Sequence, residues 1–83
     1  MQVLVIYDVE NDRVRHRVSE KCKDYGLRRV QYSAFKGQLS LNRFEELHLR
    51  LKAILGVDVG NIQMYPFCEK DVKLGKEIEN VAI

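Results

Sequence analysis

The first predicted strand is apolar on both of its faces, and this constrains the fold more than any other feature. Val3 to Tyr7 are consecutive apolar residues, and Asp8 follows them directly. Alternate side chains of a strand point to opposite sides of the sheet, so this run presents two apolar faces. Such a strand is covered on both sides, which predicts a central position in its sheet and a second covering layer beyond the one that helices supply.

An amphipathic helix is expected after this strand. Asn11 or Asp12 can cap its start, and Gly26 stands where a glycine ends a helix just past the last turn. The apolar residues between them recur at helical spacing and form one face, namely Val14, Val18, Cys22 and Tyr25. Arg15 and Arg17 flank that face, so their stems can pack on the sheet while their guanidinium groups reach its edge.

Residues 27–41 have strand composition and suit a hairpin. Its turn can lie at Tyr32-Ser33 or at Lys36-Gly37, and the residue types do not decide between them. A capping-box pattern predicts a second helix from Asn42, which Gly56 stops. A last strand covers residues 61–67, where Pro66 confines its end to an edge or a break in the ladder.

The order strand, helix, strand, strand, helix, strand predicts an α+β, ferredoxin-like βαββαβ fold. Right-handed crossovers place both helices on one face of an antiparallel sheet and leave the other face bare. All 83 residues form one domain, with a core over 1–68 and a polar tail over 69–83. A homodimer that packs sheet against sheet would cover the bare apolar face and bring two Asp8 carboxylates together.

Basic side chains are concentrated in residues 11–29. This segment has seven basic residues against three acidic ones, a local charge of +4 in a chain whose net charge is +2. Its lysines read as a solvated helix face, but the planar fork of arginine is the preferred group for phosphate contacts. Nucleic acid is the predicted partner, and the candidate contacts are Arg13, Arg15, Arg17, Arg28 and Arg29.

Asp8 is the candidate ligand for a hard divalent cation. One aspartate is a poor magnesium site, whereas two across a dimer axis, with waters and a phosphate oxygen, would suffice. Such a cation would favour phosphodiester hydrolysis, with arginine stabilising the charge on the phosphorus. The alternative is that Asp8 is a turn acid or a helix cap, and that Tyr7 packs in the core.

Several short motifs together resemble the CRISPR-associated Cas2 family, the smaller of the two core spacer-acquisition proteins. They are Tyr7-Asp8-Val9, then Arg13-x-Arg15-x-Arg17, then the run from Gly26 through Gly37, and the strand Ile62-Gln63-Met64-Tyr65-Pro66. The resemblance spans nearly the whole chain. It implies a ferredoxin-like homodimer in which a C-terminal strand, over about residues 72–78, adds to the partner's sheet.

The resemblance also implies an endonuclease that uses magnesium or manganese and cuts single-stranded RNA or double-stranded DNA. Asp8 would be the metal ligand, and five further residues match the family's functional set: Tyr7, Arg15, Arg17, Arg29 and Phe35. A second reading is a non-catalytic scaffold that clamps protospacer DNA and bridges integrase subunits. The two readings share the arginines and differ at Asp8.

Other function classes have less support. The longest apolar run has the length of a strand, which predicts no membrane association, and we expect a cytoplasmic protein. Cys22 and Cys68 are far apart in sequence, and a disulfide between them is not expected. A regulatory module for a small ligand would need a suitable loop, and the sequence offers none.

Overall fold

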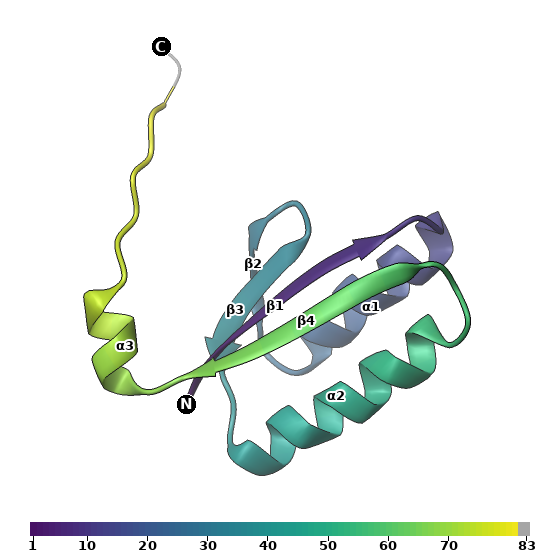
Figure 1. Ribbon diagram of the computed structural model, residues 1–83, viewed down its shortest axis with the longest axis horizontal. Coiled ribbons are helices and arrows are strands. Elements are labelled where there is room, and N and C mark those ends of the chain that lie inside the picture. Colours follow the sequence, from purple (N-terminus) through teal and green to yellow (C-terminus); the bar gives the residue numbers. More distant parts are fainter. Residues whose placement is uncertain (82–83) are drawn as a thin grey trace.

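The first strand, β1 (Gln2–Val9), lies in the middle of a four-stranded antiparallel sheet, as predicted (Figure 1). In this computed structural model, which describes residues 1–81, it pairs with β3 (Ala34–Gln38) and with β4 (Gly60–Phe67). β2 (Arg28–Gln31) pairs with the far side of β3. The strand order β2-β3-β1-β4 is that of a ferredoxin-like fold.

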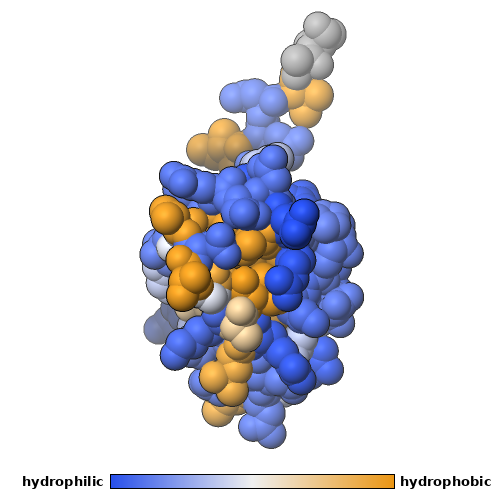
Figure 2. All heavy atoms as spheres, turned by 90° about the vertical axis from the view of Figure 1, so that its right-hand side faces the viewer, coloured by the Kyte–Doolittle hydropathy of each residue, from blue (hydrophilic) through white to orange (hydrophobic). Residues whose placement is uncertain are grey.

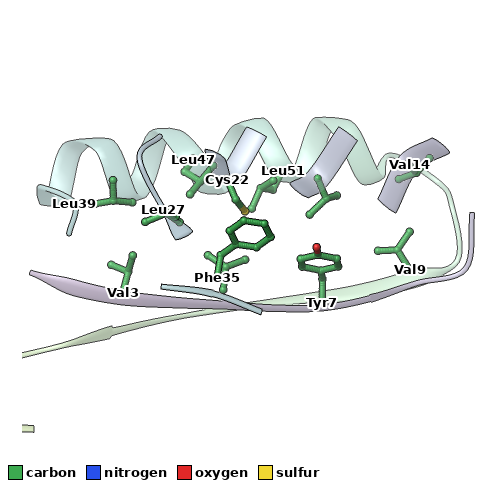
Figure 3. Close-up of a cluster of buried hydrophobic side chains, with 12 residues drawn as sticks. Val3, Tyr7, Val9, Val14, Cys22, Leu27, Phe35, Leu39, Leu47 and Leu51 are labelled. Atoms are coloured by element: carbon green, nitrogen blue, oxygen red, sulfur yellow. The ribbon is translucent and has the colours of Figure 1, made fainter. Parts of the chain in front are cut away.

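Two helices, α1 (Asp12–Asp24) and α2 (Leu41–Leu55), cover one face of this sheet. The core lies between the helices and the sheet, where β1 contributes every second residue (Figure 3). The fully or almost fully buried side chains there include Val3, Val5, Tyr7, Val9, Val18, Cys22, Phe35, Leu47 and Leu51. Both helices therefore form because each buries one apolar stripe against the same face of the sheet.

The other face of the sheet carries the even-numbered residues of β1 and has no covering layer within residues 1–81. Leu4 is half-buried, Ile6 is 39% exposed, and Tyr65 of β4 is 44% exposed on this side. We call this surface the open face. It is partly apolar, as the pattern of the first strand predicts, and the second covering layer stays a prediction.

The helix ends follow local capping. Asn11 caps α1 by accepting a hydrogen bond from the backbone N–H of Val14 at 3.0 Å, and Gly26 follows the helix with φ of 81°. Gly56 likewise follows α2, as predicted. The predicted start of α2 is wrong, because Ser40 rather than Asn42 is the cap, and its hydroxyl accepts from the N–H of Arg43 at 3.2 Å.

The hairpin turn lies at Tyr32-Ser33, between β2 and β3. Gly37 is therefore a strand residue, and its lack of a side chain serves close packing. A Cβ at this position would lie 2.7 Å from Leu27 Cδ2 and 3.2 Å from Leu27 Cα. A glycine that reads as a turn in the sequence marks instead the place where the chain entering β2 passes close to β3.

The tail differs from the expected strand. Residues 69–74 form a short helix, α3 (Glu69–Leu74), and residues 75–81 run outward without joining the sheet (Figure 1). Residues 82 and 83 of the predicted tail lie outside the described residues. Pairing of this segment with another subunit stays a prediction. Over residues 1–81, none of the helices combines the length and the apolar character needed to cross a bilayer.

The position of the α2 cap can be tested by two matched substitutions. Ser40→Ala should lower the free energy of unfolding by about 1 kcal/mol, because it removes a side chain that satisfies an N-terminal backbone N–H. Asn42→Ala, two residues further on, should change it by less than about 0.5 kcal/mol. Urea denaturation followed by circular dichroism measures both. A larger loss for Asn42→Ala would place the cap at the position that the sequence alone suggests.

Candidate metal and phosphate site

The sheet separates Asp8 from the other five residues that match the family's functional set. Tyr7 is 3% exposed and points into the core under the helices, whereas Asp8, one position further, is exposed on the open face. The alternation of side chains along β1 dictates this division. The six residues matched to the family's functional set therefore do not form one cluster, although most of them lie near the same end of the sheet.

Asp8 stands near the end of β1 and does not cap α1, because Asn11 does. This removes one alternative role for its carboxylate. Over the described residues, no three His, Cys, Asp or Glu side chains come together as a metal-binding group. The exposed Asp8 carboxylate can supply one of the oxygen ligands of Mg²⁺, which usually takes one or two protein carboxylates together with substrate phosphates and several waters. One chain thus offers half of the site that the sequence predicts.

Tyr7 and Phe35 are stacked in the core, with ring centroids 6.3 Å apart and planes inclined by 20° (Figure 3). Phe35 is fully buried, so it cannot contact a substrate and serves as a packing platform. Burial raises the pKa of the Tyr7 phenol, and the nearby Arg29 guanidinium opposes that rise. The Tyr7 hydroxyl is therefore protonated at neutral pH.

Arg29 crosses from β2 toward this aromatic pair. Its guanidinium carbon lies 4.8 Å from the centre of the Phe35 ring, a cation–π arrangement. It also donates a hydrogen bond to the backbone oxygen of Tyr32, in the hairpin turn. Arg28, its neighbour in β2, is exposed and pairs with Lys36 of β3, which places it on the open face. The two adjacent arginines thus serve opposite sides of the sheet.

Arg15 fixes the turn between β1 and α1. One of its nitrogens donates to the backbone oxygens of Val9 at 2.9 Å and Glu10 at 3.4 Å, and the other pairs with Asp12. The hydrogen bond to Asp12 raises the pKa of the Arg15 guanidinium above its ordinary value. Arg15 therefore holds the backbone that follows Asp8, a role that its sequence position on the shoulder of the helix does not reveal.

A shallow pocket of about 210 Å³ lies between α1, the end of β1 and the hairpin turn. Its lining combines two guanidinium groups with hydroxyl and imidazole groups and with the carboxylate of Asp12, which pairs with Arg15. The lining residues are Tyr7, Asp12, Arg15, His16, Ser19, Arg29 and Tyr32. The guanidinium and hydroxyl donors suit an anionic group such as a phosphate. The sequence reasoning did not assign His16, Ser19 or Tyr32 to a site, because only the fold brings the hairpin turn beside α1.

The other basic candidates lie elsewhere. Arg17 lines a groove of about 390 Å³ between α1 and α2, together with Lys21 and Arg50. Arg13 is exposed on α1. Arg17 and Arg15 thus lie on opposite shoulders of the helix, as predicted, and they cannot serve a single phosphate. Neither residue lies on the open face with Asp8.

Asn61 of β4 lies opposite Asp8 in the sheet. It is the direct register partner of Asp8 across β1 and β4, so both side chains emerge on the open face. The space-filling view of this end of the molecule shows an apolar patch surrounded by hydrophilic side chains (Figure 2). Exposed valines of the loop before β4, Val57 and Val59, belong to this end.

Comparison with known proteins gives a consistent result. Residues 1–74 match the family described as CRISPR associated protein Cas2. A protein of Desulforudis audaxviator named CRISPR-associated endoribonuclease Cas2 is 51% identical over 79 residues, which cover 95% of this chain and 74% of the relative. The crystal structure of Streptococcus pyogenes Cas2 superimposes with a TM-score of 0.78 at 27% identity, covering 95% of this chain and all of that one.

A further relative comes from Thermoproteus tenax and is named as a fusion of endonuclease Cas1 and endonuclease Cas2. It is 39% identical over 59 residues, which cover 70% of this chain and 22% of the fusion. The match therefore spans only a small part of that longer protein.

The burial of Cys22 predicts a loss of stability in alkaline solution. Burial raises the pKa of this thiol from its ordinary value of 9.0 to about 12, with Arg29 opposing. Above pH 9 the unfolded chain releases a proton that the folded chain keeps, so the free energy of unfolding should fall by up to ~1.4 kcal/mol per pH unit until about pH 12. Tyr7 should add to the fall above pH 10, since its pKa is also raised.

Urea denaturation at several alkaline pH values measures this slope. Cys22→Ala should make the slope shallower, whereas Cys68→Ala, which removes the exposed thiol, should leave it as in the wild type. Equal slopes in all three proteins would show that Cys22 ionises as readily in the folded as in the unfolded chain.

Proposed function

The chain belongs to the CRISPR-associated Cas2 family, and we propose that it is a magnesium- or manganese-dependent phosphodiester endonuclease of spacer acquisition. The observation that carries this proposal is the exposed Asp8 carboxylate near the end of β1, with a pocket of arginine and tyrosine side chains on the other side of the same strand. Spacer acquisition acts on nucleic acid in the cytoplasm, and we propose that the protein is located there.

The proposal includes a homodimer packed through the open face. Ile6 and Tyr65 leave apolar surface there that a second copy would cover. A two-fold axis through this surface would bring the two Asp8 carboxylates near each other and complete the half site. The extended residues 75–81 also favour association, because Ile78 and Val81 are largely exposed in the single chain.

The chain's own residues would act by binding and orienting the nucleic acid. Asp8 would hold the cation, which supplies polarisation of the phosphoryl group and a water of lowered pKa. Arg29 and Tyr7 would bind a phosphate in the pocket, while Arg15 would hold the turn that follows Asp8. Arg13, Arg17 and Arg28 would contact further phosphates without reading sequence.

We propose RNA as the substrate to test before duplex DNA, since the relative from Desulforudis audaxviator is named an endoribonuclease.

A second function, supported by a different observation, is a scaffold for an integrase partner. The Thermoproteus tenax relative is named as a Cas1 and Cas2 fusion, which favours a working complex of the two proteins. The exposed Val57 and Val59 and the outward tail offer surface for such a partner. In this role the dispersed arginines would clamp duplex DNA, and Asp8 would not be needed.

The nuclease function is tested by Asp8→Asn. This change keeps the shape of the side chain and removes its charge, so magnesium-stimulated cleavage of RNA and duplex DNA should fall to the level measured without magnesium. The dimer should persist in size-exclusion chromatography. Asp24→Asn, an equal change in an exposed ion pair with Lys21, is the control and should cut like the wild type. Equal cleavage by wild type and Asp8→Asn would identify a contaminating nuclease.

The scaffold function is tested by spacer acquisition in cells. Removal of residues 72–83 should abolish acquisition if the tail holds the complex together, whereas Asp8→Asn should still support it. Sequencing of the repeat array measures new spacers. Acquisition that survives the truncation would count against the scaffold, and acquisition lost in Asp8→Asn would show that the carboxylate is required.

A further inference from the structure

Tyr32 is an exposed aromatic residue at the hairpin turn between β2 and β3. It is 74% exposed, whereas Tyr65, the other exposed aromatic among residues 1–81, is 44% exposed. The turn itself does not require an aromatic side chain, because turns favour glycine, asparagine, aspartate and serine, and Tyr32 has no positive φ. A tyrosine at this position is therefore a candidate for a contact with a ligand.

The turn that carries Tyr32 is fixed to two strands. The backbone N–H of Tyr7, in β1, donates to the carbonyl oxygen of Ser33 at 3.0 Å. The Arg29 guanidinium, from β2, donates to the carbonyl oxygen of Tyr32. Both residues of the turn are thus held by a neighbouring strand. A ligand that packs on a side chain held in this way has less conformational freedom to remove, which favours binding.

Tyr32 also lines the pocket between α1, the end of β1 and the hairpin turn. The same pocket is lined by Tyr7 and by the guanidinium groups of Arg15 and Arg29. The hydrogen bond with Asp12 does most to raise the pKa of the Arg15 guanidinium, and the Tyr32 hydroxyl adds to that rise, so the hydroxyl lies close to this cation. The exposed aromatic ring and the donors for a phosphate therefore belong to one surface.

The size of the pocket determines which part of a nucleic acid can enter it. Its volume of about 210 Å³ is below the roughly 300–1,000 Å³ of sites that enclose a drug-sized ligand. A phosphate group fits such a space, whereas the nucleobase of the same nucleotide must lie outside it. Tyr32 lines the pocket and is largely exposed, so its ring lies at the rim, where that base would be.

We propose that Tyr32 is a base-stacking residue, whose ring packs against an unpaired nucleobase next to the phosphate in this pocket. Every nucleobase has a flat π face, so the contact does not depend on sequence. In a duplex the bases are paired and stacked on one another, and the ring cannot reach their faces. Tyr32 therefore favours single strands over duplexes and does not distinguish RNA from DNA.

The proposed homodimer would leave this contact accessible. Tyr7 and the residues of α1 that line the pocket lie on the helix side of the sheet, whereas the second copy would pack on the open face. The inference rests on the proposed function in one respect, namely that Arg29 and Tyr7 bind a phosphate. It needs neither Asp8 nor a cation, and it can be tested without cleavage.

Binding in EDTA provides the main test, because metal-dependent cleavage is then absent. Fluorescence anisotropy would measure the affinity for a labelled, unstructured single-stranded RNA, for single-stranded DNA of the same sequence and for the matching duplex DNA. Tyr32→Leu keeps an apolar side chain and removes the π face, so the affinity for both single strands should fall at least about fivefold. The affinity for the duplex should stay within about twofold of the wild type, since phosphate contacts dominate there.

Two matched variants serve as controls. Tyr32→Phe keeps the ring and loses the hydroxyl, and it should bind single strands within about twofold of the wild type. Leu49→Ala removes an apolar side chain of α2 that is 63% exposed, and it should bind in the same range. A loss in Tyr32→Phe as large as that in Tyr32→Leu would assign the effect to the hydroxyl and overturn the stacking role. Wild-type affinity in Tyr32→Leu, or a parallel loss on the duplex, would overturn it as well.

An abasic strand separates the contribution of the base from that of the phosphate. Single-stranded DNA in which every nucleotide lacks its base keeps the phosphates and offers nothing for the ring to stack on. The wild type should bind this strand more weakly than the normal one, and Tyr32→Leu should bind it as the wild type does. If Tyr32→Leu loses equal affinity for the normal and the abasic strand, Tyr32 acts through the turn or through Arg15, and the inference is wrong.

Failure of the nuclease proposal would look different. If single strands bind with the predicted dependence on Tyr32 and are not cut in Mg²⁺, the stacking role stands and the catalytic function falls. If Asp8→Asn abolishes cleavage while Tyr32→Leu binds and cuts as the wild type does, the catalytic function stands and this inference falls. A wild type that binds no single strand in EDTA would also overturn the inference.

Discussion

The central strand β1 is the constraint on which the rest of the structure depends. It hydrogen-bonds to β3 and β4, and its odd-numbered residues supply the layer of side chains that both helices bury. Because its side chains alternate, the even-numbered residues are committed to the open face. Tyr7 and Asp8 are neighbours in the chain and are nevertheless held on opposite sides of the sheet.

The two sides of the sheet also separate most arginines of the basic segment, residues 11–29, from Asp8. Arg15 hydrogen-bonds the turn after β1, and Arg29 lies over the Phe35 ring. Both guanidinium groups therefore already have contacts within the chain. Arg17 faces the groove between the helices. Arg15 and Arg29 line one pocket, whereas Arg13, Arg17 and Arg28 lie apart from it, so a bound nucleic acid would meet the basic groups at several different phosphates. Non-specific binding by a dispersed basic surface is consistent with this arrangement.

The open face combines a charged side chain with apolar surface. Asp8 and Asn61 stand opposite each other near one end, and Ile6 and Tyr65 follow along the strands. Apolar surface beside a carboxylate is costly to leave in water in a chain of this size, which gives a physical reason for a second copy to cover it. The same association would bring the separate carboxylates toward one site.

Much of the fold and part of the site were determined by the sequence alone, because they depend on local chemistry. The alternation of Val3 to Tyr7 predicts a central strand, and Asn11, Gly26 and Gly56 mark helix ends through their own hydrogen bonds and backbone angles. The same alternation places Asp8 on the side of β1 opposite Tyr7, and its role as a metal ligand stays a prediction.

Only the tertiary structure decided features that depend on segments distant in the chain. The hairpin turn and the role of Gly37 follow from how Leu27 passes β3, and the pairing of Asp8 with Asn61 follows from strand register. Residues far apart in sequence carry no local sign of which of them will meet, since the packing of the whole core sets that register.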